Sequence, residues 1–285
     1  MVNSPACQPL PEGQLEEWIP ALLEASRDAA EAILEVYQRA DFEVEHKSDQ
    51  SPLTAADLAS HRILSTALQR LTPDIPVLSE ESREIPVEDR LQWPRLWVVD
   101  PLDGTREFIK RNGEFTINIA LVEQQQARLG LIAVPVESNA YIGLTESGQA
   151  MHYTGYSTCE FIHTRAKCPE QPTILGSRSH GNAASSAYFQ QLDQQFNHYH
   201  RVGAGSALKF CKVAEGSADF YPRMGPTSEW DTAAGQALVE AAGGRVWLAD
   251  GREMRYNART SLLNDSFLVA GDPNASWPTP TTASR

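Results

Sequence analysis

Two carboxylates three residues apart, Asp100 and Asp103, are the clearest sign of chemistry in this sequence. They stand in the run D-P-L-D-G-T, directly after the strand-like residues R-L-W-V-V. Pro101 stiffens the turn, and Gly104 lets the backbone approach a bound group closely. Like charges this close are unfavourable without a cation between them, and carboxylate oxygens suit Mg²⁺ or Mn²⁺. We therefore predict a metal site; the alternative is a solvated turn in which Asp103 caps a helix.

Two further segments carry acids that could reach this site, and a third acid lies at a helix start earlier in the chain. Glu80 follows a short apolar run in L-S-E-E, Asp231 opens a helix of small residues in E-W-D-T-A-A-G, and Asp57 lies at another helix start in T-A-A-D. S-E-E alone is typical of surface charge, and Asp231 can serve simply as a helix N-cap. The Ala and Gly residues behind Asp231 nevertheless indicate a helix pressed tightly against a neighbour.

The elements that would position these residues form two different patterns. Before about residue 166, two helices precede strands that look like antiparallel neighbours; after it, strands alternate with helices. We predict an α+β first half (1–165), an α/β second half (166–273) and a disordered tail (274–285) rich in Pro, Thr, Ser and Ala. The expected helices are 16–39, 54–71, 184–193, 206–216 and 231–242, and the expected strands are 75–78, 95–100, 115–122, 129–136, 140–144, 173–175, 198–202, 218–221, 245–248 and 267–270.

The composition narrows the classes of partner. The formal net charge is -13 over 285 residues, which disfavours nucleic acid and anionic membranes as partners. An anionic substrate would need local basic residues or bound cations. No run approaches the roughly 20 apolar residues of a membrane span, and residues 1–13 do not read as a signal peptide. The four cysteines lack zinc-ligand spacing, which favours free thiols in a reducing cytosol.

Taken together, these motifs resemble the inositol monophosphatase superfamily. Its signatures, a strand ending in D-P-[LI]-D-G-T and a later W-D-x-A-A-G, stand at 100–105 and 230–235, and the resemblance covers roughly residues 29–270. It implies a five-layer αβαβα sandwich with the site between the halves, and two or three Mg²⁺ ions, with Mn²⁺ as a substitute. The metal ligands that it implies are Glu80, Asp100, Asp103, Asp231 and the backbone carbonyl of Leu102.

The resemblance also implies how phosphate would be removed. Asp57 matches the acid that holds a metal-bound water, while Glu80 and Thr105 match the pair that orients the attacking water. The N–H groups of Gly104 and Thr105, at a helix start, would cradle phosphate beside Asp103 and Asp231. This is metal-assisted hydrolysis without a covalent intermediate. A covalent aspartyl mechanism of the D-x-D-G-T type is disfavoured, because the acids here are three apart and lie near residue 100.

Further segments are similar to one branch, the 3'(2'),5'-bisphosphate nucleotidases of the bacterial CysQ type. These are residues 100–122, S-P-L-T-A-A-D at 51–57, S-R-S-H at 177–180, and the stretches 203–210 and 221–227. The implied reaction converts adenosine 3',5'-bisphosphate to AMP and phosphate, in connection with sulfate assimilation. Lys209 and Arg223 would bind the second phosphate by charge-assisted hydrogen bonds. Without the resemblance, a solvated lysine and a surface ion pair would be preferred. The implied substrate-side residues also include Ser179, His180 and Ser206.

Two other functions stay open. One is a sugar or polyol phosphatase like inositol monophosphatase itself. The other is a non-catalytic regulatory binding protein, which should have lost an acid at 80, 100, 103 or 231; none is lost. We expect a monomer or homodimer with a small-molecule nucleoside bisphosphate as substrate and no nucleic acid partner. The expected location is the cytoplasm, with peripheral attachment to the cytoplasmic face of the inner membrane left open.

Overall fold

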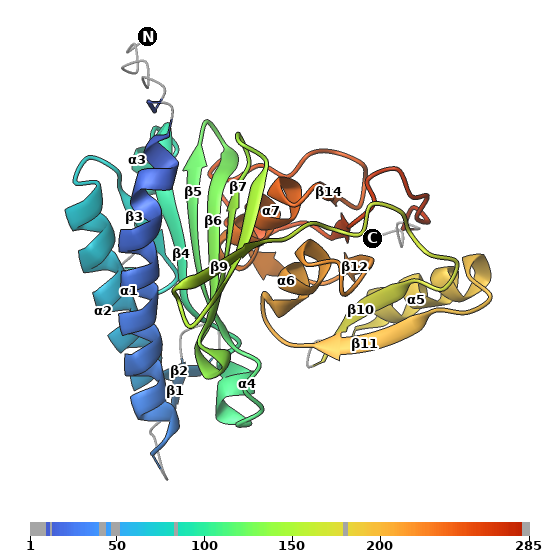
Figure 1. Cartoon of the computed structure of the whole chain (residues 1–285), viewed down its shortest axis with the longest axis horizontal. Coiled ribbons are helices and arrows are strands. Elements are labelled where there is room, and N and C mark those ends of the chain that lie inside the picture. Colours follow the sequence, from blue (N-terminus) through green and yellow to red (C-terminus); the bar gives the residue numbers. More distant parts are fainter. Residues whose placement is uncertain are drawn as a thin grey trace.

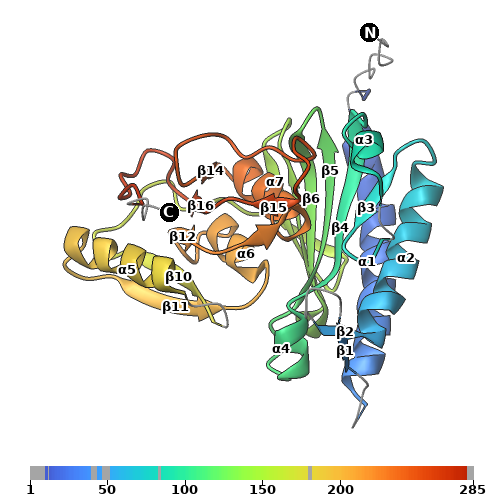
Figure 2. The same cartoon turned by 180° about the vertical axis from the view of Figure 1, so that it is seen from behind.

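The chain folds into five stacked layers of helices and sheets. The structure, a computed structural model, describes residues 10–11, 13–39, 44–46, 52–82, 85–178 and 182–280. In order across the molecule, the layers are α1 with α2, a seven-stranded sheet, α6 with α7, a five-stranded sheet, and α5 (Figure 1). Figure 2 shows the same order from behind. The five-layer αβαβα sandwich predicted from the sequence is confirmed. The helices are α1 Gln14–Tyr37, α2 Ala55–Leu71, α3 Val87–Arg90, α4 Thr105–Ile109, α5 Ala183–Gln195, α6 Leu208–Ala214 and α7 Ala233–Ala241, with 3-10 turns η1 Pro135–Glu137 and η2 Glu229–Asp231.

The first sheet has the strand order β3-β4-β5-β6-β7-β8-β9, and the second has the order β11-β10-β12-β16-β14. Among the described strands of the first sheet, β3 and β4 run parallel and the other neighbouring pairs run antiparallel. The first sheet comprises β3 Val77–Ser79, β4 Arg95–Asp103, β5 Thr116–Glu123, β6 Gln126–Val134, β7 Asn139–Leu144, β8 Gln149–Thr154 and β9 Thr158–Phe161. The second comprises β10 Thr173–Ser177, β11 His200–Ala204, β12 Phe220–Arg223, β14 Arg245–Leu248 and β16 Phe267–Ala270, and two short pairs are β1 Val44–His46 with β2 Pro52–Thr54 and β13 Thr227–Ser228 with β15 Leu263–Asn264.

Helix α7 lies pressed against the inner face of the first sheet. A Cβ added to Gly130 of β6 would stand 2.1 Å from the Ala234 carbonyl oxygen, and one added to Gly143 of β7 would stand 2.4 Å from the Leu238 Cα. Only glycine permits this approach. The expectation of a tightly packed helix behind Asp231 is thereby confirmed.

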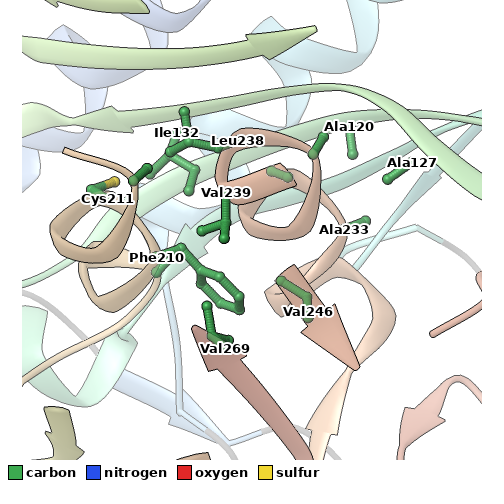
Figure 3. Close-up of a cluster of buried hydrophobic side chains, with 14 of the residues drawn as sticks. Ala120, Ala127, Ile132, Phe210, Cys211, Ala233, Leu238, Val239, Val246 and Val269 are labelled. Atoms are coloured by element: carbon green, nitrogen blue, oxygen red, sulfur yellow. The ribbon is translucent and has the colours of Figure 1, made fainter. Parts of the chain in front are cut away.

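The largest core lies between the two sheets and is shared by both halves. In Figure 3, Ile132 of the first sheet, Phe210 of α6, Leu238 of α7 and Val269 of the second sheet gather in one buried cluster. A second core lies under α1 and α2 on the other face of the first sheet. The first sheet ends at Phe161 and the second begins at Thr173, so the boundary that we propose at 165/166 falls in the connection between them.

Several expected boundaries were wrong. The helix expected from residue 231 begins at Ala233, because residues 229–231 form the separate turn η2. The helix expected from 206 begins at Leu208. Strands β8 and β9 and the short helix α4 were not predicted. All four residues of β9 are exposed, so this strand has no buried face to produce an alternating pattern.

The first part of the expected disordered tail packs on the second sheet. The Trp277 ring stacks on Phe220 with centroids 3.8 Å apart, and the Tyr188 hydroxyl donates to the Pro278 carbonyl at 2.7 Å. The expectation of disorder is therefore wrong for residues 274–280, because a single aromatic residue supplies enough buried area to dock the segment. Residues 281–285 lie outside the described part. None of the helices in that part combines the length and apolar character needed to cross a bilayer.

Candidate active site

Glu80 and Asp100 lie near the carboxyl ends of β3 and β4, which are neighbouring strands of the first sheet. Strands β3 and β4 are parallel, with Ser79 opposite Val99, so their carboxyl ends coincide. The Glu80 N–H extends this pairing by donating to the Val99 carbonyl at 3.0 Å. Glu80 therefore stands beside Asp100, as the two sequence segments indicated.

A bulge brings Asp100 and Asp103 to one side of the sheet. Asp100 pairs with Asn118 of β5 and Asp103 pairs with Thr116, so three steps along β4 match two steps along β5. Residues three apart in a regular strand point to opposite faces, and the extra residue of a bulge reverses that relation. The Pro-Leu insertion in D-P-L-D thus puts both carboxylates in one place.

Asp231 reaches the same place from the second half. It ends the η2 turn, where its Oδ2 accepts a hydrogen bond from the Ser228 N–H at 2.8 Å. Asp231 is therefore not the N-cap of α7; that position belongs to Thr232. One carboxylate oxygen from each of Asp100, Asp103 and Asp231 lies within 4.8 Å of the others.

The charges of this cluster oppose one another. Burial, followed by the charges of Glu80, Asp103 and Asp231, raises the pKa of Asp100, which is 1% exposed. Burial also raises the pKa of Asp103 to about 6 and that of Asp231 to about 8. A divalent cation removes such repulsion and takes oxygen ligands. The donor set fits a metal ion, and the aspartates Asp100, Asp103 and Asp231 would hold it.

Asp57 forms a hydrogen-bonded pair with Thr105, which lines the same cavity as the three aspartates. The Thr54 N–H and hydroxyl both donate to Asp57 Oδ2, at 2.8 and 2.6 Å, which fixes the carboxylate at the start of α2. The Thr105 hydroxyl lies 3.3 Å from Asp57 Oδ1 and 3.4 Å from the Leu102 carbonyl oxygen. Ser60 of α2 donates to the Pro101 carbonyl at 2.7 Å, so the helix also holds the bulge.

The two halves meet closely at Gly104. It has φ of 92° as the N-cap of α4, and a Cβ there would stand 3.2 Å from the Ser206 Cβ. Asp103 does not cap this helix; its Oδ2 accepts from Asn118 Nδ2 at 3.3 Å. Ser206 has φ of 40°, and its buried Oγ has no hydrogen-bond partner in the described part of the chain. A buried hydroxyl in this state is open to a ligand.

Two cations from the second half face the acids. Lys209 is 4% exposed, and its Nζ donates to the carbonyls of Ala204 and Ser206 at 3.1 and 2.6 Å. The alternative of a solvated lysine is therefore wrong. Burial lowers the pKa of Lys209 to about 8, against the opposing effect of the Asp103 charge. Arg223 donates to the Pro226 carbonyl at 3.1 Å, and its buried Nε has no partner among the described residues.

A single cavity of about 360 Å³ connects the acids with the cations. Of the residues expected at the site, its lining contains ten, while Asp57 lies behind Thr105, and Ser179 and His180 fall outside the described residues. The ten are Glu80, Asp100, Leu102, Asp103, Gly104, Thr105, Ser206, Lys209, Arg223 and Asp231.

Some residues of the site were missed by the sequence reasoning. Asn118 holds Asp103, and its Oδ1 accepts from the Thr116 hydroxyl at 3.0 Å. Its signal was present, because an amide between Ile117 and Ile119 in a buried strand requires a polar partner. Glu107 also lines the cavity and is 2% exposed. The residues next to it in the sequence gave no sign that it would be buried at the site.

Comparison with known proteins identifies close relatives. Residues 14–276 match the inositol monophosphatase family. The 3'(2'),5'-bisphosphate nucleotidase CysQ of Salmonella typhimurium is 46% identical over 245 residues, covering 86% of this chain and 96% of the relative. The protein of the same name from Escherichia coli K12 is 45% identical over 246 residues, with the same coverage. The crystal structure of CysQ from Bacteroides thetaiotaomicron, a bacterial member of the inositol monophosphatase family, superimposes with a TM-score of 0.80 at 38% identity, covering 90% of this chain and 97% of that one.

Proposed function

The chain belongs to the inositol monophosphatase family, and we propose that it is a metal-dependent nucleotidase that converts adenosine 3',5'-bisphosphate to AMP and phosphate. The observation that carries this proposal is the cavity in which Lys209 and Arg223 face the carboxylate cluster. A nucleoside bisphosphate needs two anion sites, one where phosphate is removed and one where it is retained. The 45–46% identity to CysQ nucleotidases supports the same choice of substrate.

The carboxylate cluster is the proposed reaction site. Glu80, Asp100, Asp103, Asp231 and the Leu102 carbonyl would hold two or three Mg²⁺ ions, with Mn²⁺ as a substitute. When bound, such ions lower the pKa of a bound water and neutralise charge on the phosphoryl oxygens.

The chain's own groups then place the water and the phosphate. The Thr105 hydroxyl, held by Asp57 at 3.3 Å, orients the attacking water, and Glu80 accepts its proton. The N–H groups of Gly104 and Thr105 contact the phosphate being removed, next to Asp103 and Asp231.

The second phosphate is assigned to the cationic wall of the cavity. Lys209 and Arg223 provide the charge, and the unpartnered Ser206 Oγ provides a further hydrogen bond. Ser179 and His180 are proposed to contact the nucleotide from the neighbouring segment. A cytoplasmic location and a role in sulfate assimilation accompany this substrate.

A phosphate-release panel tests the proposal. The substrates are adenosine 3',5'-bisphosphate, inositol 1-phosphate and fructose 1,6-bisphosphate, each with Mg²⁺ and with a chelator. We expect the highest kcat/KM with adenosine 3',5'-bisphosphate and no turnover with chelator. A higher kcat/KM with inositol 1-phosphate would instead identify a polyol phosphatase.

A further inference from the structure

A fully buried arginine connects the two halves outside the cavity. Arg90 ends α3, in the connection between β3 and β4, and is 2% exposed. Its Nη1 donates to Asn257 Oδ1 at 2.7 Å, and its Nη2 donates to the carbonyls of Arg259 and Thr260 at 2.8 and 2.7 Å. A buried guanidinium requires partners for its donors, and here all three acceptors lie in one loop of the second half.

Asn257 connects Arg90 by hydrogen bonds to the turn that carries Asp231. Its Nδ2 donates back to the Arg90 carbonyl at 2.6 Å, and its N–H donates to Glu229 Oε2 at 2.7 Å. Glu229 is fully buried and begins the η2 turn, which Asp231 ends. Arg90, Asn257 and Glu229 therefore form a continuous hydrogen-bonded chain from the first half to the Asp231 turn.

The same loop also holds the backbone of the turn. The Glu229 N–H donates to the Leu262 carbonyl at 2.9 Å. Asn264 Nδ2 donates to the Ser228 carbonyl at 2.7 Å and to Thr232 Oγ1 at 2.9 Å. Both ends of the turn are thus fixed by residues 257–264, and Arg90 ties that segment to the half that carries Asp100 and Asp103.

We propose that Arg90, through Asn257 and Glu229, is a positioning residue that sets the place of Asp231 relative to Asp100 and Asp103. The inference rests on the proposed function only in treating these aspartates as metal ligands. Groups that orient metal ligands tune metal affinity even though they do not contact the ion. A positioning role therefore predicts a loss of metal affinity beyond what lower stability alone would cause.

A Mn²⁺ titration followed by electron paramagnetic resonance tests this in the full chain without substrate. In Asn257→Gly, glycine accepts the φ of 50° and keeps the N–H to Glu229 while removing both side-chain bonds to Arg90. We expect Mn²⁺ affinity to fall by about tenfold. The affected ion should be the same one whose binding is weakened in Asp231→Asn. Arg90→Lys, which keeps the charge but not the forked donors, should give a smaller loss in the same direction.

Arg165→Met is the matched control. Arg165 donates to both Asp219 carboxylate oxygens at 2.8 Å and to the Gly216 carbonyl at 2.9 Å, and these residues do not line the cavity. The control should lower the thermal midpoint but keep the wild-type Mn²⁺ affinity. Unchanged affinity in Asn257→Gly, or equal weakening in the control, overturns the proposal.

If Asn257→Gly does not fold, the comparison is made between Arg90→Lys and the control, and wild-type affinity in Arg90→Lys then overturns the proposal. The titration contains no substrate, so failure of the nucleotidase assignment in the phosphate-release panel would be a separate result.

Discussion

The acidic and the cationic sides of the cavity are built in different ways. The acids Asp100 and Asp103 lie on β4, a nine-residue strand paired on both sides by β3 and β5. The cations Lys209 and Arg223 lie on α6 and β12, elements of seven and four residues. Asp100 and Asp103 are thus held by a long strand, with a bulge between them, whereas Lys209 lies on a short helix and Arg223 lies at the end of a four-residue pairing with β16.

The polar groups on the two sides also differ in their partners. Asp103 accepts a hydrogen bond from Asn118, whereas Ser206 Oγ and Arg223 Nε are buried with no partner in the described part of the chain. Buried polar atoms without a hydrogen-bond partner lower stability, and a bound ligand can supply the missing partners. The difference supports our proposal that the acidic side supplies the chemistry and that the cationic side selects the substrate.

The largest effect should follow from removing a charge on the acidic side. Asp103→Asn keeps the size of the side chain but cannot offset a cation's charge. We expect kcat/KM to fall by at least about 1,000-fold, roughly 4 kcal/mol, for every substrate alike. The exposed Asp250→Asn is the control and should retain activity. Near wild-type activity of Asp103→Asn at low Mg²⁺ would remove Asp103 from the metal ligands.

A smaller loss is expected when the Thr105 hydroxyl is removed. Thr105→Ala should lower kcat by about 100-fold or more with little change in KM, because we propose that the hydroxyl orients water rather than substrate. Thr105→Ser keeps the hydroxyl and should recover much of kcat. Should Thr105→Ala raise KM while leaving kcat intact, Thr105 would be a phosphate-binding group on the acidic side.

The cationic side should show a loss that depends on the substrate. Losing one charge-assisted contact costs about 1.5–3 kcal/mol, so Arg223→Ala should lower kcat/KM for adenosine 3',5'-bisphosphate by roughly 10- to 150-fold. Inositol 1-phosphate has no second phosphate and should be little affected. Arg245→Ala, on β14 of the same sheet but outside the cavity, is the control. An equal loss on both substrates would mean that Arg223 supports the fold or the shared site.

The smallest effect concerns stability of the metal-free protein. Burial and the Asp103 charge raise the pKa of Asp231 from 3.8 to about 8. A carboxyl with a raised pKa binds its proton more tightly in the folded state, so its contribution to stability falls as pH rises between these values. The side-chain amide of the variant Asp231→Asn does not titrate. The difference in thermal midpoint, wild type minus variant, should decrease as the pH rises to about 8 and then level off. A difference that rises with pH would contradict the raised pKa of Asp231.

The sequence was most informative where local geometry alone brings residues together. D-P-L-D-G-T carries its own bulge, so Asp100 and Asp103 were paired correctly before any fold was known. The small residues of α7 likewise indicated a close contact, which Gly130 and Gly143 provide. In both cases the signal lies within a few residues of the feature that it predicts.

Features that depend on contacts between distant segments were not accessible in the same way. Nothing near Arg90 indicates that it bonds to a loop 167 residues later. The burial of Lys209 also arises from tertiary packing, because its helix sequence alone is typical of a solvated lysine. The tail was misjudged for the same reason, since the docking of Trp277 depends on an aromatic partner in β12.

Binding of the second phosphate by the cationic side is tested most directly with two substrates that differ only in that phosphate. The kcat/KM of the wild-type protein is measured with adenosine 3',5'-bisphosphate and with adenosine 3'-monophosphate, which share the base, the sugar and the 3'-oxygen from which phosphate is removed. If the cationic side holds the second phosphate, the bisphosphate should be preferred by at least about tenfold, and Arg223→Ala should reduce that preference. Equal kcat/KM values for the two substrates in the wild-type protein would contradict the assignment of the second phosphate to the cationic side.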